Sequence, residues 1–199
     1  MTPRTPGAGL QIPLRLPFTN MNPQTKKIRD NLIKLRGQLW PDVTPEMIWH
    51  RRRSDGFITI PRTMPLLMVM MDALSKGRPV SSTYLELWCR SHDEAILLLA
   101  GKEFGYATAS GFSGERAVST WSSRLDILAK LGFIRLAPGA AGPRAYALLL
   151  NPYHAARQHR DKLEAFLWNT FAERTIEIRA NDLEETEEAS RPATKKKRS

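Results

Sequence analysis

The chain has 199 residues, of which 42% are apolar, and it carries a formal net charge of +10. This length suits one folded domain with appendages, or two small domains. No stretch approaches the roughly 20 consecutive apolar residues of a membrane-spanning helix, and the first residues lack the apolar segment of a signal peptide. We therefore expect a cytoplasmic protein, associated with the nucleoid, whose basic excess favours nucleic acid ahead of an anionic membrane.

The first third of the chain is basic and is predicted to lie outside the main domain. Residues 1–21 contain four prolines and little periodicity, which predicts a disordered arm. Residues 22–60 are predicted to form a helical extension, because Asn22-Pro23 is a helix start and an apolar stripe follows it. That stripe recurs at helical spacing and consists of Ile28, Leu32, Leu35 and Leu39.

A second start signal lies at Thr44-Pro45-Glu46 and predicts a short helix to about residue 52. It ends in the densest basic cluster before the tail, formed by Arg51, Arg52 and Arg53. Guanidinium groups pair well with phosphate, so these side chains are candidate DNA contacts. A solvated helix end, where cations suit the helix dipole, is an equally weighted alternative.

Residues 61–152 are predicted to form the main domain. Its first helix, over 63–74, is apolar almost all round and should be a buried central helix. The capping box Thr83-x-x-Glu86 predicts a short helix through Trp88. A short buried strand over 96–100, able to pair with a later hairpin, and a short helix over 103–110 follow.

The stretch from 113 to 152 is predicted to be one long helix followed by a β-hairpin. Ser113 is the expected N-cap, and apolar residues recur every three or four positions up to Leu131. Gly132 supplies the left-handed residue that ends many helices. Strand-like runs at 133–136 and 145–150 flank the turn residues 138–143.

This order of elements resembles the winged helix-turn-helix family, over residues 63–152. The strongest local match is R-L-x-x-L-x-x-L-G-F-I at 124–134, followed by G-x-R-x-Y-x-L at 142–148. It is similar to the recognition helix and wing of bacterial regulators of the multiple-antibiotic-resistance type and of plasmid replication proteins. Residues 109–121 are similar to small winged-helix proteins carried by mobile elements. The resemblance implies a mainly α fold with a small β-sheet, in which the recognition helix (113–131) and the wing (133–150) bind DNA.

A helical wheel separates the apolar side of the long helix from a polar side. The N-terminal half of a recognition helix enters the major groove, so the polar residues of that half are the candidates for base contacts. Asp126 would be repelled by phosphate and should mark the end of the contact, and Arg124 lies at the apolar edge and is interpreted as structural. The predicted DNA-binding residues of the domain are Ser113, Arg116, Ser119, Thr120, Ser123, Lys130, Arg135 and Arg144.

Residues 153–180 are predicted to contain one long C-terminal helix with an apolar edge, which either makes a homodimer or packs on its own domain. Residues 181–199 hold an acidic run and a basic run and are predicted to be a disordered charged tail.

The sequence offers little enzyme chemistry. It contains no phosphate-binding glycine loop, its four histidines show no metal-ligand spacing, and its single cysteine, Cys89, excludes a disulfide and is expected to be buried. We expect no catalytic residue, cofactor or metal. The preferred function is sequence-specific binding of double-stranded DNA, as a transcriptional regulator of a mobile element. The alternatives are a plasmid replication or partition protein with the same DNA contacts, and a winged-helix adaptor that docks a protein partner.

Overall fold

The computed structural model describes residues 23–51 and 53–180, which fall into two units divided after Gly56. The predicted N-terminal arm, the predicted charged tail and Arg52 lie outside the described residues. Within the described ranges, no helix combines the length and the apolar character that crossing a membrane requires.

The N-terminal unit contains helix α1 (Pro23–Leu39) and a single 3-10 turn, η1 (Pro45–Met47). Helix α1 has the predicted start and ends before Pro41. The predicted second helix to about residue 52 is wrong, because Ile48 is already extended, with φ −105° and ψ 124°. A helix this short does not recover its nucleation cost unless one of its faces packs, and no residue of η1 is buried.

The second unit is mainly helical, with one three-stranded antiparallel sheet in its described part, which confirms the predicted fold class. Its strands are β1 (Ile96–Leu98), β2 (Ile134–Gly139) and β3 (Gly142–Leu149), in the order β1-β3-β2. The short first strand pairs with the later hairpin, as predicted, with Leu97 opposite Ala147. Its helices are α2 (Met64–Leu74), α3 (Ser81–Arg90), α4 (Glu103–Ala109), α5 (Ala117–Lys130), α6 (Pro152–Gln158) and α7 (Ala165–Glu177).

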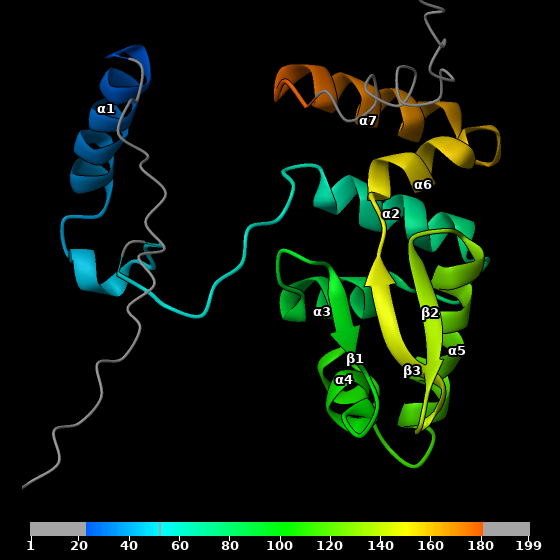
Figure 1. Cartoon of the computed structure of the whole chain (residues 1–199). Coiled ribbons are helices and arrows are strands. Elements are labelled where there is room, and N and C mark those ends of the chain that lie inside the picture. The colour runs from blue at the N-terminus through cyan, green and yellow to red at the C-terminus, as the bar shows by residue number, and fades with distance from the viewer. Residues whose placement is uncertain (1–22, 52, 181–199) are drawn as a thin grey trace, which may run out of the picture. The chain divides into compact units, whose positions relative to one another are not determined.

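Helix α2 is the centre of the core, as its continuous apolar run predicts. It packs against α3 on one side and against α6 and α7 on another, and Figure 1 shows α6 and α7 at the end of the unit away from the hairpin tip. Met64, Leu67, Met70 and Met71 are at most 1% exposed. The methionines of α2 therefore fill the core instead of lining an open groove.

The C-terminal segment is two helices, so the prediction of one long helix is wrong. Helix α6 ends at Gln158, a 3-10 turn η2 (Arg160–Lys162) follows, and Leu163 is extended and buried. His159 Nε2 lies 2.9 Å from the Leu131 carbonyl oxygen at the end of α5, which holds the break in place. Helix α7 then buries Phe171, whose ring lies 5.6 Å from that of Tyr153. The C-terminal helix thus packs on its own domain.

Two predicted helix caps are also wrong. Thr83 lies inside α3, and the α3 start is capped instead by Asp72 of α2, whose Oδ1 accepts hydrogen bonds from the Val80 and Ser81 backbone N–H groups at 2.7 and 2.9 Å. Ser113 is exposed and lies ahead of Arg116, the residue at the N-cap position of α5. The predicted end of α5 is confirmed, because Gly132 has φ +78° and Phe133 N–H bonds to the Leu128 carbonyl at 3.0 Å.

Candidate nucleic-acid interface

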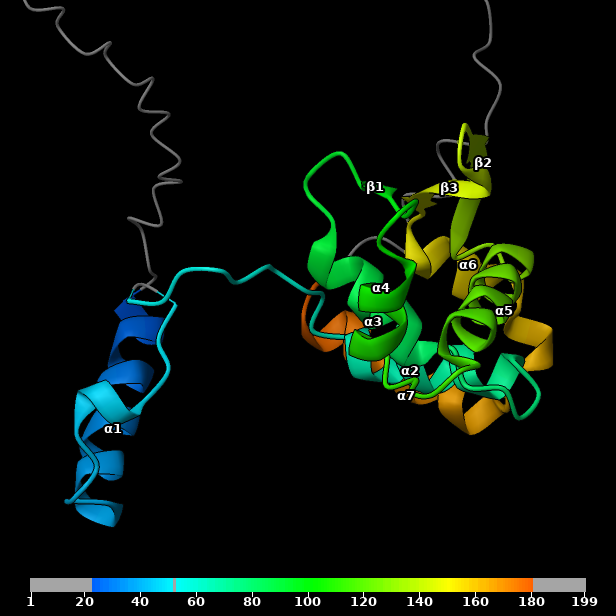
Figure 2. The ribbon, with the colours of Figure 1, turned by 90° about the horizontal axis from the view of Figure 1, so that it is seen from below.

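Helices α4 and α5 form a helix, turn and helix whose geometry is fixed by aromatic packing. Ser110 ends α4 by donating its hydroxyl to the Tyr106 carbonyl at 2.7 Å. Gly111 and Gly114 then adopt positive φ, which lets the chain reverse within a few residues. The Tyr106 ring stacks on the Trp121 ring of α5, with centroids 5.5 Å apart and planes 19° apart. Figure 2 shows the two helices side by side, and this stack sets the position of α5 relative to α4.

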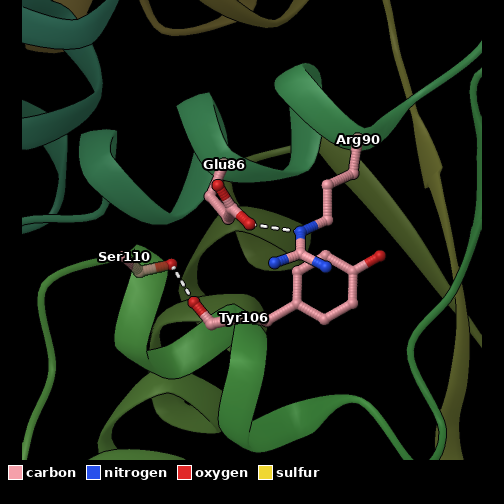
Figure 3. A network of polar contacts seen from close by, with 4 residues as sticks. All are labelled: Glu86, Arg90, Tyr106 and Ser110. Atoms are coloured by element: carbon pink, nitrogen blue, oxygen red, sulfur yellow. Dashed lines mark hydrogen bonds and ion pairs between the residues drawn. The ribbon is translucent and has the colours of Figure 1, made fainter. Parts of the chain in front are cut away.

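A polar network from α3 contacts the same Tyr106 ring (Figure 3). Arg90 forms an ion pair with Glu86, one turn earlier on α3, and its guanidinium lies 4.5 Å from the centre of the Tyr106 ring. Burial raises the pKa of Tyr106, with Arg90 acting in the opposite direction. The ring therefore stays a neutral phenol between a cation and an indole, and α3, α4 and α5 are held together through it.

The outer side of α5 presents the predicted base-contacting residues together. Arg116 and Ser119 are exposed, and Thr120 and Ser123 are half-buried beside them, opposite the fully buried Trp121. The Ser119 hydroxyl donates to the Arg116 carbonyl at 2.9 Å, which leaves its oxygen lone pairs able to accept. Ser113 is exposed in the turn that leads to this face. The polar surface made by these side chains is called here the α5 face.

Arg144, the predicted wing contact, is paired with Asp126 of α5. Its Nε lies 2.7 Å from Asp126 Oδ1 and its Nη2 lies 2.6 Å from Oδ2, which is a two-point carboxylate contact. These hydrogen bonds raise the pKa of Arg144 above its ordinary value. The pair fastens strand β3 to α5 and neutralises the carboxylate that would otherwise repel phosphate.

The other predicted contacts lie outside the α5 face. Lys130 is exposed in the last turn of α5. Arg135 is exposed on β2, directly opposite Leu148 in the sheet register. Arg51 and Arg53 belong to the N-terminal unit, where Arg53 Nη2 donates to the Pro45 carbonyl at 2.7 Å. The structure thus brings together the predicted contacts of the α5 face. Lys130, Arg135, Arg51 and Arg53 are not part of that face.

Arg124 occupies the structural place that the sequence predicts, with an unexpected partner. Its guanidinium lies 5.9 Å from the centre of the Phe112 ring in the α4–α5 turn, and its buried Nε has no hydrogen-bond partner within the described chain. Its partner in the described chain is thus an aromatic face. Arg124 therefore braces the turn and is not part of the α5 face.

The outer side of the sheet carries an apolar surface that the sequence pattern did not predict. Ile96 and Leu98 of β1 stand in register with Leu148 and Tyr146 of β3, and all four are exposed. The side chains on a solvent-exposed face of an antiparallel sheet are usually polar. The signal was present in the run 96–100, which is apolar at consecutive positions and therefore on both faces of the strand.

Other kinds of site have weaker support within the described residues. No three His, Cys, Asp or Glu side chains in this part of the chain come together as a metal-binding group. A shallow groove between the start of α2 and α7 is lined by Leu66 and Thr170 together with charged side chains. Cys89 is exposed, which corrects the expectation that it is buried. Partial burial, together with the nearby Glu86 carboxylate, raises the pKa of its thiol and makes it a poor nucleophile.

Comparisons of the chain with protein-family models, with curated proteins and with solved structures find no match. Function is therefore inferred from the residues of the α5 face and from the elements that hold it.

Proposed function

We propose that residues 61–152 are a winged helix-turn-helix domain that binds double-stranded DNA, with α5 in the major groove. The observation that carries this proposal is the α5 face, a row of exposed and half-buried Arg, Ser and Thr side chains on a helix that follows a tight turn from α4. The element order and the β1-β3-β2 sheet are those expected of that family. They support the proposal by placing a hairpin beside the same helix, as Figure 2 shows.

In this proposal, the residues near the N-terminus of α5 contact bases and the other cations contact phosphates. Arg116 and Ser119, near its N-terminus, reach base edges, where a guanidinium pairs with guanine and hydroxyls accept or donate. Lys130, Arg135 and the basic cluster of residues 51–53 contact phosphates, which adds affinity without sequence preference. Arg144 contacts phosphate only after its ion pair with Asp126 breaks.

The role that fits such contacts is a transcriptional regulator of a mobile element, acting by occupying an operator. A homodimer would bind an inverted repeat. The C-terminal helix is a limited interface for that dimer, because Phe171 faces its own core and only Phe166 and Ile176 remain largely exposed. A replication or partition protein with the same contacts is the near alternative, and it would require clustered repeats at an origin.

The apolar outer face of the sheet favours a second candidate function, a protein-docking adaptor. Ile96 and Leu98 are 57% and 47% exposed, which is unusual for aliphatic side chains in a sheet. An adaptor would bind DNA weakly and without preference among sequences.

The deciding experiment is a selection of DNA from a random library by the purified protein, at two salt concentrations. We expect a motif to emerge, and Arg116→Ala to relax one position of it with a loss of about 10- to 100-fold at the preferred base. Ser119→Ala should act more weakly on a neighbouring position. Arg78→Ala is the charge-matched control, since Arg78 is exposed in the α2–α3 connection. Binding that is sequence-blind, steeply salt-dependent and indifferent to Arg116→Ala would contradict the proposal and favour the adaptor.

A further inference from the structure

Helix α1 carries an apolar stripe that its own unit leaves open. Ile28, Leu32, Leu35 and Leu39 follow one another at spacings of four, three and four, and they are 48–60% exposed. This stripe is called here the α1 seam. These spacings place the four residues at heptad positions d, a, d and a, the apolar positions by which two helices pack along each other.

The side chains beside the α1 seam indicate which partner fits it. In this heptad numbering, Arg29 and Arg36 lie at e positions on one side of the seam, and Asn31 and Gln38 lie at g positions on the other. The three lysines of α1 lie on the outer positions b and c. The seam is thus a narrow apolar line with cations on one flank and amides on the other.

We propose that the α1 seam is covered by α1 of a second copy of this chain, in parallel orientation. In a parallel pair the g and e positions meet, so Asn31 faces Arg36 of the partner subunit and no like charges are opposed. In an antiparallel pair the e positions meet each other, so Arg29 faces Arg36 of the partner subunit, which is repulsive. The charge pattern therefore permits self-pairing in one orientation only.

The alternative occupant, a membrane surface, fits the seam less well. A helix that lies in a membrane interface has a broad apolar face rich in large side chains, whereas this seam is one residue wide. Self-pairing also explains how α1 persists, because an isolated helix of 17 residues is marginal in water without a packed face. The inference is independent of DNA binding, since it concerns the other unit of the chain.

The expected association is weak, because the seam spans only two heptads. We expect a dissociation constant of about 10 µM to 1 mM for the full chain. Sedimentation equilibrium from about 5 to 500 µM, in buffer without DNA, should show a monomer–dimer equilibrium. Leu35→Asp should weaken it at least tenfold. The matched control is Ile33→Asp, because Ile33 is also exposed on α1 but lies off the seam, and it should change the constant less than twofold.

A cysteine cross-link tests the orientation. Leu39→Cys is made in a Cys89→Ser background, because the single natural cysteine is exposed. Under oxidising conditions a parallel pair brings the two copies of position 39 together and gives a covalent dimer. In a centred antiparallel pair they lie about 16 Å apart, at about 1.5 Å per residue, and stay unlinked. Cys89→Ser alone is the control.

Several outcomes overturn the inference. A chain that stays monomeric at 500 µM contradicts it, as does a dimer that is unaffected by Leu35→Asp. A dimer without the Leu39→Cys cross-link contradicts the parallel orientation. The remaining test uses vesicles of phosphatidylserine and phosphatidylcholine. If a monomeric chain binds these vesicles and Leu35→Asp abolishes that binding, the α1 seam is a membrane contact instead. None of these readouts uses DNA, so this inference and the proposed DNA binding can fail separately.

Discussion

At the scale of single residues, the Asp126–Arg144 pair affects how basic the surface beside the α5 face is. Both side chains are more than a third exposed, at 49% and 40%, so the pair adds little to folding stability. The pair instead fixes the position of the Arg144 guanidinium, on the hairpin, against the middle of α5. It also means that the cation and the carboxylate cancel in the free protein.

Replacing Asp126 therefore tests whether Arg144 can contact phosphate once its ion pair is removed. Asp126→Asn removes a negative charge and loosens Arg144, so we expect DNA to bind about 3- to 10-fold more tightly at low salt, with a steeper salt dependence. The unfolding free energy should change by less than about 1 kcal/mol. Fluorescence anisotropy with labelled DNA measures the first and denaturant unfolding measures the second.

Two further variants make this prediction specific. Arg144→Ala added to Asp126→Asn should reverse the gain in affinity. Asp93→Asn removes an equal charge from the exposed α3–β1 connection and should have a smaller effect. An unchanged affinity for Asp126→Asn would show that Arg144 serves only to fasten the hairpin.

At the scale of elements, the polar network drawn in Figure 3 and the aromatic stack behind it make Tyr106 the residue on which α3, α4 and α5 converge. Its ring is 3% exposed, between the Arg90 guanidinium and the Trp121 indole. Because α4 has only seven residues, its own backbone hydrogen bonds cannot hold it in place. The position of α4 against α5 therefore depends strongly on this side chain.

Tyr106→Ala should destabilise the domain by about 3 kcal/mol, because a large buried ring is removed from between two partners. Phe104→Ala is the matched control on the same helix, where the ring is 70% exposed, and it should cost less than about 0.5 kcal/mol. Chemical denaturation followed by circular dichroism measures both. Equal costs for the two variants would mean that the stack does not position α4.

The elements also show what a sequence can and cannot predict here. Helix α2, the end of α5 at Gly132 and the turn of the β2–β3 hairpin follow from periodicity and turn residues, which are local signals. The α3 cap does not, because Asp72 lies on another helix, and the break after α6 depends on a hydrogen bond between His159 and Leu131, 28 residues apart. Local patterns carry no information on such distant partners.

The same division applies to the candidate site. The polar side of α5 could be placed from a helical wheel, since Trp121 and Leu125 fix which side is buried. The pairing of Arg144 with Asp126 and of Arg124 with Phe112 could not, because each depends on how two elements meet. The apolar sheet face was visible as a run of apolar residues, but the run does not indicate that one side stays open.

At the scale of the whole molecule, the described residues form two units, and the core lies entirely in the second. Every buried residue of the described chain lies beyond Gly56, between Thr63 and Thr175. The N-terminal unit contributes cations and the α1 seam, which are surface features. The two units should therefore separate their roles, with the fold and the α5 face in one and added charge in the other.

Deletion of residues 1–56 tests this separation. We expect the remaining chain to keep its unfolding free energy within about 0.5 kcal/mol, because none of the described residues in the deleted segment is buried. DNA affinity should fall, and the slope of log affinity against log salt should decrease by about one for each phosphate that the N-terminal cations neutralise in the full chain. The preferred sequence should stay the same. A change in the preferred sequence on deletion would place base-reading residues in the N-terminal unit.

The hydrogen bond between the Thr63 and Tyr153 hydroxyls, 2.5 Å long and spanning 90 residues, joins the beginning of the domain to its end. During synthesis, α2 leaves the ribosome long before α6 and α7, the helices that pack against one side of it. Because translation proceeds at about 5 to 20 residues per second, that side stays exposed for roughly 5 to 20 seconds before α6 and α7 can pack on it. Over that interval the nascent chain displays its most apolar helix to chaperones and to neighbouring nascent chains, so the yield of folded protein depends on the pace of translation through the hairpin.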